Sequence, residues 1–141
     1  MTTISFFIPG APRAKQRHRF GGGHSYTPRE TVVAEKTMGM YAKLAMGNRP
    51  PFKGPVSVII EVYYARPKSW PKKRKDVWKT SKPDVDNLVK LGKDSMNRIV
   101  WLDDAQVVSL FAFKRYTSEK EVGMYVTVQD LGDQDAAPPL R

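Results

Sequence analysis

Five aspartates lie between residues 84 and 104, in the stretch KPDVDNLVKLGKDSMNRIVWLDDAQV, although the whole chain has a formal charge of +10. Asp84 and Asp86 form a D-x-D pair, and Asp103 and Asp104 follow as an adjacent pair. Carboxylates that lie close together repel one another unless a cation shares their site. Since hard cations such as Mg²⁺ and Mn²⁺ prefer carboxylate oxygens, the acids predict a Mg²⁺ site that would also take Mn²⁺.

Such an ion beside a DNA backbone would support phosphodiester hydrolysis. It can polarise the phosphate, lower the pKa of an attacking water and stabilise the leaving oxygen. Lys90 follows Asp86 by one helical turn, and its ammonium could stabilise the negative charge that develops in the transition state. The interpretation is that acids hold the metal while a cation assists the chemistry.

Each acid also has a structural explanation. An aspartate at the start of a helix often caps it, and Asp86 with Lys90 is an ordinary i,i+4 ion pair that stabilises a helix by about 0.3–0.5 kcal/mol. Asp103 and Asp104 could cap a turn. The metal hypothesis depends on all these features coinciding in a chain with few other acids.

The basic residues are concentrated in the first part of the chain. Residues 1–83 contain 17 lysines and arginines against 4 acids, whereas residues 84–141 contain 7 against 10. Two segments, PRAKQRHRF at 12–20 and RPKSWPKKRKDVWK at 66–79, hold much of the excess. Because such clusters attract polyanions, we expect DNA contacts from Arg13, Lys15, Arg17, Arg19, Lys72, Lys73, Arg74 and Lys75.

Composition excludes several classes of site and location. The chain has no cysteine, which excludes disulfides, thiolate nucleophiles and cysteine-bound zinc. No apolar run approaches the roughly 20 residues that span a bilayer, and the first residues lack the pattern of a secretion signal. We therefore expect a cytoplasmic protein that makes no membrane contact.

The length of 141 residues suits one domain with a single core. Strands are predicted at 4–8, 56–65, 107–116 and 122–128, and the last two are expected to form a hairpin around TSEKE. Thr27, Pro28 and Glu30 predict a helix that begins with a capping box and runs to about Gly47. The expected fold is α/β (α+β), with a mixed sheet and two main helices over 1–130 and a disordered tail at 131–141.

The second helix, predicted at 85–99, would position the acids. At 100° per residue its core-facing arc contains Val85, Leu88, Val89, Leu91, Gly92, Met96 and Ile99. Asp86, Lys90, Lys93 and Asn97 occupy the opposite arc. Asp84 should precede the helix in an extended segment, beside Asp86, and Asp103 and Asp104 should return next to them after the helix.

The blocks DVDNLVK and WLDDAQV, with their spacing, resemble the signature of RusA-type Holliday junction resolvases, a family of small metal-dependent endonucleases of bacteria and phages. By this resemblance Asp84, Asp86 and Asp104 are metal-binding aspartates and Lys90 is a catalytic lysine, while Asp103 lies beside the third acid. The resemblance also implies a mixed α/β fold, a homodimer and paired nicks across four-way DNA.

The sequence thus predicts a Mg²⁺-dependent endodeoxyribonuclease that resolves Holliday junctions and acts in DNA recombination and repair. Two alternatives stay open: a DNA-binding accessory protein of recombination with structural acids, and a metal nuclease acting on flaps or forks.

For Trp70 and Trp78 we weigh stacking on unpaired bases against packing on the core, and Trp101 is expected to be a core anchor. His18 and His24 are expected to contact phosphate or solvent, and GGG at 21–23 to form a flexible hinge.

Overall fold

A computed structural model describes residues 2–12, 19–26, 29–74, 77–133 and 137–140. Its strands are β1 (Thr3–Pro9), β2 (Arg19–Gly21), β3 (His24–Tyr26), β4 (Val56–Ala65), β5 (Val107–Thr117) and β6 (Gly123–Asp130). Its helices are α1 (Arg29–Met46), α2 (Val85–Met96) and the short 3₁₀ helix η1 (Asp104–Gln106). The predicted mixed sheet with two main helices is confirmed. Thr27 and Pro28, which were expected to begin α1, lie outside the described residues.

The main sheet has the order β1-β6-β4-β5, with β5 parallel to β4 and the other neighbours antiparallel. The predicted hairpin of β5 with β6 is therefore wrong, because β4 lies between these two strands. β4 alternates buried Val56, Val58, Ile60 and Val62 with less buried residues. Pairing on both sides satisfies the backbone of this buried strand, which a β5–β6 hairpin would not do.

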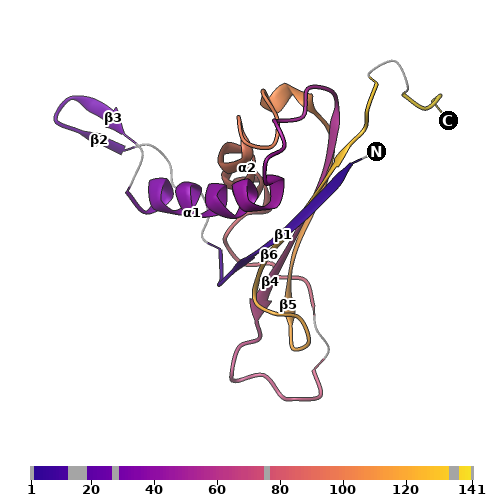
Figure 1. Cartoon of the computed structure of the whole chain (residues 1–141). Coiled ribbons are helices and arrows are strands. Elements are labelled where there is room, and N and C mark those ends of the chain that lie inside the picture. The colour runs from indigo at the N-terminus through magenta and orange to yellow at the C-terminus, as the bar shows by residue number, and fades with distance from the viewer. Residues whose placement is uncertain (1, 13–18, 27–28, 75–76, 134–136, 141) are drawn as a thin grey trace.

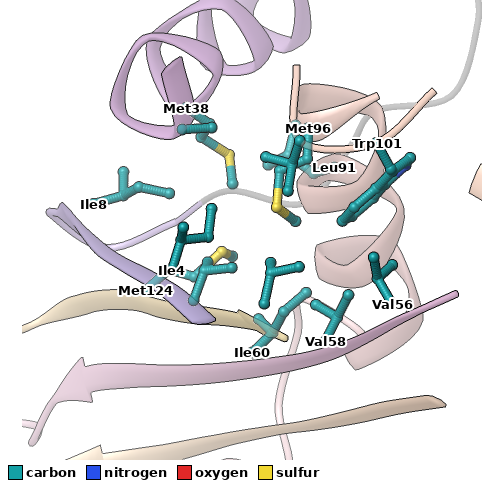
Figure 2. Packing of buried hydrophobic residues seen from close by; sticks show 14 of the residues in the cluster. Ile4, Ile8, Met38, Val56, Val58, Ile60, Leu91, Met96, Trp101 and Met124 are labelled. Carbon is teal, nitrogen blue, oxygen red and sulfur yellow. The ribbon is translucent and has the colours of Figure 1, made fainter. Parts of the chain in front are cut away.

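The core lies between the sheet and the two helices, which cover the same face (Figure 1). Ile4 and Ile8 of β1, Met38 of α1, and Leu91 and Met96 of α2 meet the inward side chains of β4 there (Figure 2). Trp101 is fully buried at one end of this cluster, so its predicted role as a core anchor is confirmed.

Helix α2 follows its predicted pattern at most positions. Leu88, Leu91, Gly92 and Met96 are buried, whereas Asp86 and Lys90 are exposed. Gly92 lets the helix approach the sheet, since a Cβ there would lie 3.3 Å from Ile60 Cδ1. Val85 is 38% exposed instead of buried, because the core does not reach the helix start.

The helix also ends three residues before the predicted Ile99. Asn97 leaves the helical conformation with ψ 130°, and Arg98 takes a left-handed φ of 67°. The Arg98 N–H then donates to Trp101 O at 2.7 Å. This turn begins the connection from α2 to the second acidic pair.

The glycines at 21–23 do not form the flexible hinge that we predicted. Gly22 and Gly23 have φ of 57° and 80° and join β2 to β3, with Gly21 paired to His24. Two successive positive φ values are what a two-residue hairpin turn requires. The hairpin projects from the molecule beyond one end of α1 (Figure 1).

Beyond β6, the described residues 131–133 and 137–140 contain no helix or strand. The Leu131 N–H donates to Pro55 O at 2.9 Å, so the first part of this segment is attached to the start of β4. Whether residues 131–141 are disordered stays a prediction. Within the described residues, no helix is both long and apolar enough to cross a membrane.

Candidate active site

The start of α2 presents the D-x-D pair and the lysine to solvent. Asp84 is the N-cap residue in extended conformation (φ −69°, ψ 144°), as predicted, and Asp86 lies in the first helical turn. The Asp84 carboxylate makes no capping hydrogen bond, so the capping explanation for this residue is wrong. Asp84, Asp86 and Lys90 are all exposed. Their carboxylates and ammonium are therefore accessible to a ligand.

Lys114 of β5 holds the segment in front of α2 in place. Its Nζ donates to Ser81 O and to Pro83 O, each at 2.6 Å. Charge-assisted hydrogen bonds of this length are among the stronger ones in proteins. Lys114 therefore positions the extended chain that leads into Asp84. The sequence gives no local signal for this role, because Lys114 is far from Asp84 along the chain.

The second acidic pair lies in a turn that its own side chains stabilise. Asp103 is the N-cap of η1, and its Oδ1 accepts the Ala105 N–H at 2.8 Å. Gln106 completes a capping box, because its Oε1 accepts the N–H groups of Leu102 and Asp103 at 2.8 and 2.9 Å. The capping explanation is thus confirmed for Asp103.

Gln106 is a positioning residue that the sequence reasoning missed. Its Nε2 donates to Phe52 O at 2.7 Å and to Gly54 O at 2.9 Å, which ties the turn to the segment before β4. The D-x-x-Q spacing of Asp103 and Gln106 is a capping-box pattern and could have identified this residue.

Asp104 has a different partner. Its Oδ1 accepts the indole N–H of buried Trp101 at 2.8 Å. A buried ring that donates to a partly buried carboxylate fixes the direction of that carboxylate, as the supporting residues of a metal or catalytic site do. The buried Trp101 ring therefore orients the Asp104 carboxylate, whereas the Asp103 carboxylate caps η1.

Within one chain the two acidic pairs do not come together. Among the described residues, which include all four of these aspartates, no three acidic or histidine side chains are placed to hold a metal ion. The expectation that Asp103 and Asp104 return beside Asp84 and Asp86 is thus wrong for a single chain.

The helix itself causes this separation. The first pair precedes α2 and is held near Lys114, whereas the second pair precedes Val107 at the start of β5. Lys114 and Val107 are seven residues apart on one strand, or about 23 Å at 3.3 Å per residue. The 12 residues of α2 span a comparable distance of roughly 18 Å. The carboxylate oxygens suit Mg²⁺ chemically, but one chain does not assemble them.

The basic loop between β4 and α2 extends from the end of the sheet at which β4 and β5 finish (Figure 1). Lys72, Lys73 and Arg74 are exposed there, as DNA contacts require. The Arg74 guanidinium also lies over the Trp70 ring, 3.8 Å from its centroid. Trp70 packs edge-on against Tyr116 at 4.9 Å, and Tyr116 in turn packs against the core. This contact favours the packing interpretation of Trp70, and base stacking by Trp70 stays a prediction.

Trp78 differs from Trp70 in exposure. It is 62% exposed, with Phe113 edge-on at 5.8 Å and the Arg115 guanidinium 5.3 Å from its ring centroid. An exposed indole beside a guanidinium can stack on a base. For Trp78 the stacking hypothesis therefore stays open.

A cluster of lysine and tyrosine side chains connects this loop with the D-x-D segment. The Lys79 ammonium lies 4.9 Å from the Tyr64 ring centroid and donates to the Tyr116 hydroxyl at 3.3 Å. Hydrogen bonds from Ser81 and Lys79 lower the pKa of Tyr116. Burial raises the pKa of Tyr64 to about 12, and its hydroxyl donates to Pro12 O at 3.1 Å.

The remaining predicted DNA contacts are not placed by the structure. Arg13, Lys15, Arg17 and Lys75 lie outside the described residues, as does His18. Arg19 and His24 belong to β2 and β3, but their side chains are not among those described. Their contacts with DNA stay predictions.

Comparison with known proteins identifies the family. A family model described as "Endodeoxyribonuclease RusA" matches residues 9–129. The chain belongs to the RusA endodeoxyribonuclease family. The match spans both acidic pairs, Lys90 and the main sheet, apart from residues 3–8 of β1 and the last residue of β6. The resemblance inferred from DVDNLVK and WLDDAQV is thereby confirmed.

Two relatives illustrate the range of this family. The chain is 33% identical over 137 residues to the uncharacterized protein YqaN of Bacillus subtilis (strain 168), covering 89% of this chain and 96% of the relative. It is 35% identical over 74 residues to the crossover junction endodeoxyribonuclease rusA of Lactococcus phage r1t, covering 52% of this chain and 54% of the phage protein. RusA membership implies endodeoxyribonuclease activity.

Proposed function

We propose that this RusA-family protein is a Mg²⁺-dependent endodeoxyribonuclease that resolves four-way DNA junctions by paired nicks. The observation that carries the proposal is the RusA match over residues 9–129, which contains exposed Asp84, Asp86 and Lys90 at the start of one helix. The phage relative named as a crossover junction endodeoxyribonuclease supports the choice of a junction as substrate.

The separation of the acidic pairs supports a homodimer. Since one chain keeps them at opposite ends of α2, we propose that the Asp84–Asp86 pair of one copy and Asp104 of a second copy would hold the ion together. A two-fold dimer would contain two such sites, as two nicks in one encounter require. The bound ion would supply Lewis-acid activation of the phosphate and of water.

The residues of the chain itself have separate roles in this proposal. Lys90, exposed one turn after Asp86, would contact the scissile phosphate and stabilise its developing charge. Lys114 and Trp101 would act as positioning residues through their hydrogen bonds to Pro83 O and Asp104 Oδ1. Exposed Lys72 and Lys73 would bind the DNA backbone.

The test is a cleavage assay on synthetic four-way, forked and linear DNA of matched sequence, with Mg²⁺, Mn²⁺ or EDTA. We expect symmetric cuts in the four-way substrate with either metal and none with EDTA. Equal or preferred cutting of the fork would favour the flap or fork nuclease. Binding without cutting under every condition would favour the accessory protein.

A further inference from the structure

Lys79, Ser81, Lys114 and Tyr116 form a polar cluster between the basic loop and the D-x-D pair. The Lys79 Nζ donates to Ser81 Oγ at 2.8 Å and to the Tyr116 hydroxyl at 3.3 Å. The Lys114 Nζ donates to the carbonyl oxygen of the same Ser81 at 2.6 Å. Two ammonium groups therefore converge on one serine, although like charges repel one another.

This cluster has no negative charge of its own. Both lysines are partly buried, and among the described residues neither ammonium is paired with a carboxylate. Lys79 donates to two hydroxyl oxygens and Lys114 to two backbone carbonyls, all of which are neutral. Charges removed from water are usually paired, so the cluster has a positive excess that an external anion can neutralise.

The cluster also has more hydrogen-bond donors than acceptors. An ammonium group has three N–H donors, and each hydroxyl has one O–H donor. Within the cluster, Ser81 Oγ and the Tyr116 oxygen are the side-chain acceptors for Lys79, and these two oxygens lie 3.4 Å from each other. A phosphate group, which only accepts hydrogen bonds, suits such an excess of donors.

Aromatic rings hold the Lys79 ammonium in position. It lies 4.9 Å from the Tyr64 ring centroid and 5.0 Å from that of Tyr116. Tyr64 is buried, and Tyr116 packs against Trp70. A cation that is already positioned loses less side-chain entropy on binding a ligand than a free surface lysine does. In this respect Lys79 differs from the exposed lysines earlier in the loop.

The cluster lies close to the acids of the proposed metal site. Ser81 precedes Asp84 by three residues, which span at most about 11 Å. Lys114, which binds Ser81 O, also binds Pro83 O directly before Asp84. One DNA strand carries a phosphate about every 3.4 Å along the helix axis. A phosphate at the cluster is therefore within about three nucleotides of a phosphate at Asp84.

We propose that Lys79, Ser81 and Tyr116 bind a second, non-scissile phosphate of the DNA strand that is cut. Lys79 supplies the charge, the ammonium and the hydroxyls donate to the phosphate oxygens, and Lys114 adds to the positive potential. A strand held at this phosphate presents the next ones to the acids in a defined position. The inference rests on DNA as the substrate of the proposed function, and it assigns the residues that set the register of the strand.

The test combines Lys79→Gln with four-way DNA in which single phosphates are replaced by uncharged methylphosphonates. Binding is measured by fluorescence anisotropy in EDTA, so the readout does not require cleavage. At one position near the branch, we expect the replacement to weaken binding of the wild type about 10-fold. The Lys79→Gln protein should bind this modified DNA and unmodified DNA equally well, because its contact is already lost.

Further variants separate phosphate binding from support of the loop. Tyr116→Phe keeps the ring that packs against Trp70 and removes the hydroxyl, so binding should weaken about threefold and depend less on the same phosphate. Lys79→Arg keeps the charge and should stay sensitive to that phosphate. Lys43→Gln removes the same charge from an exposed position of α1 and should keep the wild-type response at every position.

The outcomes separate this phosphate site from the activity. If wild type and Lys79→Gln lose equal affinity at every modified position, the site is overturned, whatever the stability of the variant in urea and while junction cleavage by wild type stays intact. A coupled phosphate farther than about three nucleotides from the cut bond would overturn its placement. Coupling of Lys79 and Tyr116 to one phosphate, without cleavage in Mg²⁺ or Mn²⁺, would support the site and contradict the proposed function.

Discussion

At the scale of single residues, the structure distinguishes acids that resemble one another in the sequence. Asp103 caps η1 through Ala105 N, whereas Asp84 makes no capping hydrogen bond and Asp104 is directed by the Trp101 indole. An N-cap aspartate without a capping hydrogen bond keeps its carboxylate oxygens available to a ligand. The functional hypothesis is therefore stronger for Asp84 and Asp104 than for Asp103.

Asp86→Asn tests the first acidic pair, because it keeps the side-chain shape and removes the charge. We expect junction cleavage to fall at least about 100-fold, while junction binding is kept or becomes tighter because a repulsion from phosphate is removed. Single-turnover cleavage and a gel-shift titration measure the two effects. The control Asp94→Asn makes the same change in the last half of α2 and should leave cleavage near the wild-type rate. Normal cleavage by Asp86→Asn would contradict the assignment of Asp86 as a metal-binding residue.

Trp101→Phe tests how Asp104 is positioned. The substitution keeps an aromatic ring in the core but removes the N–H that donates to Asp104 Oδ1 at 2.8 Å. Loss of such a supporting hydrogen bond typically reduces metal affinity or activity by about 10–100-fold. We expect a shift of the Mg²⁺ dependence of cleavage to higher concentration, with the fold kept in circular dichroism. An unchanged Mg²⁺ dependence would show that the indole only fills the core.

Tyr64 predicts an alkaline effect on stability. Its pKa is raised to about 12 by burial, so the folded state keeps a proton that an unfolded tyrosine loses near pH 10. The unfolded state then binds fewer protons, and the free energy of unfolding decreases as pH rises from about 10 to 12. Urea denaturation at pH 9, 10 and 11 should show this decrease, and Tyr64→Phe should reduce its slope.

At the scale of elements, the loop at 66–82 has two parts with different roles. Trp70 packs between Arg74 and Tyr116, and Lys79 reaches Tyr116, so these residues shape the loop. Lys72 and Lys73 are exposed, and their charge can be changed without disturbing that packing. The loop can therefore be tested for DNA binding without removing its structure.

Lys72→Gln with Lys73→Gln is the corresponding prediction. If both lysines bind phosphates, the slope of log affinity against log salt should decrease by about 1.8, that is about 0.9 for each phosphate that is no longer neutralised. Fluorescence anisotropy at several salt concentrations measures the slope. Lys36→Gln with Lys43→Gln on α1 removes the same charge, and an equal decrease there would indicate diffuse attraction instead of direct binding by the loop.

At the scale of the whole molecule, the separated acidic pairs lead to a complementation test. A heterodimer of Asp86→Asn and Asp104→Asn subunits has one site with both changes and one site with neither, if each site combines the two copies. It should nick a cruciform plasmid once, although each variant alone is inactive. Agarose gels separate nicked from linear plasmid, and wild type should produce linear product. An inactive mixture would indicate that each chain builds its own site.

The sequence by itself determined the features that depend on near neighbours in the chain. The 3.6-residue periodicity placed Leu88, Leu91 and Met96 on the buried face of α2 and Asp86 on the exposed face. The β-branched and aromatic run at 56–65 predicted β4 to the residue. The DVDNLVK and WLDDAQV blocks identified the family.

Only the tertiary structure decided which distant residues are neighbours. Insertion of β4 between β5 and β6 and the hydrogen bonds from Lys114 to Ser81 O and Pro83 O depend on contacts between segments far apart in the chain. Asp86 and Asp104 are 18 residues apart in the sequence, which suggested that they share one site. Helix α2, however, is a rigid helix of 12 residues that rises about 1.5 Å per residue along its axis. A helix holds its two ends apart, so proximity in sequence could not bring the acids together.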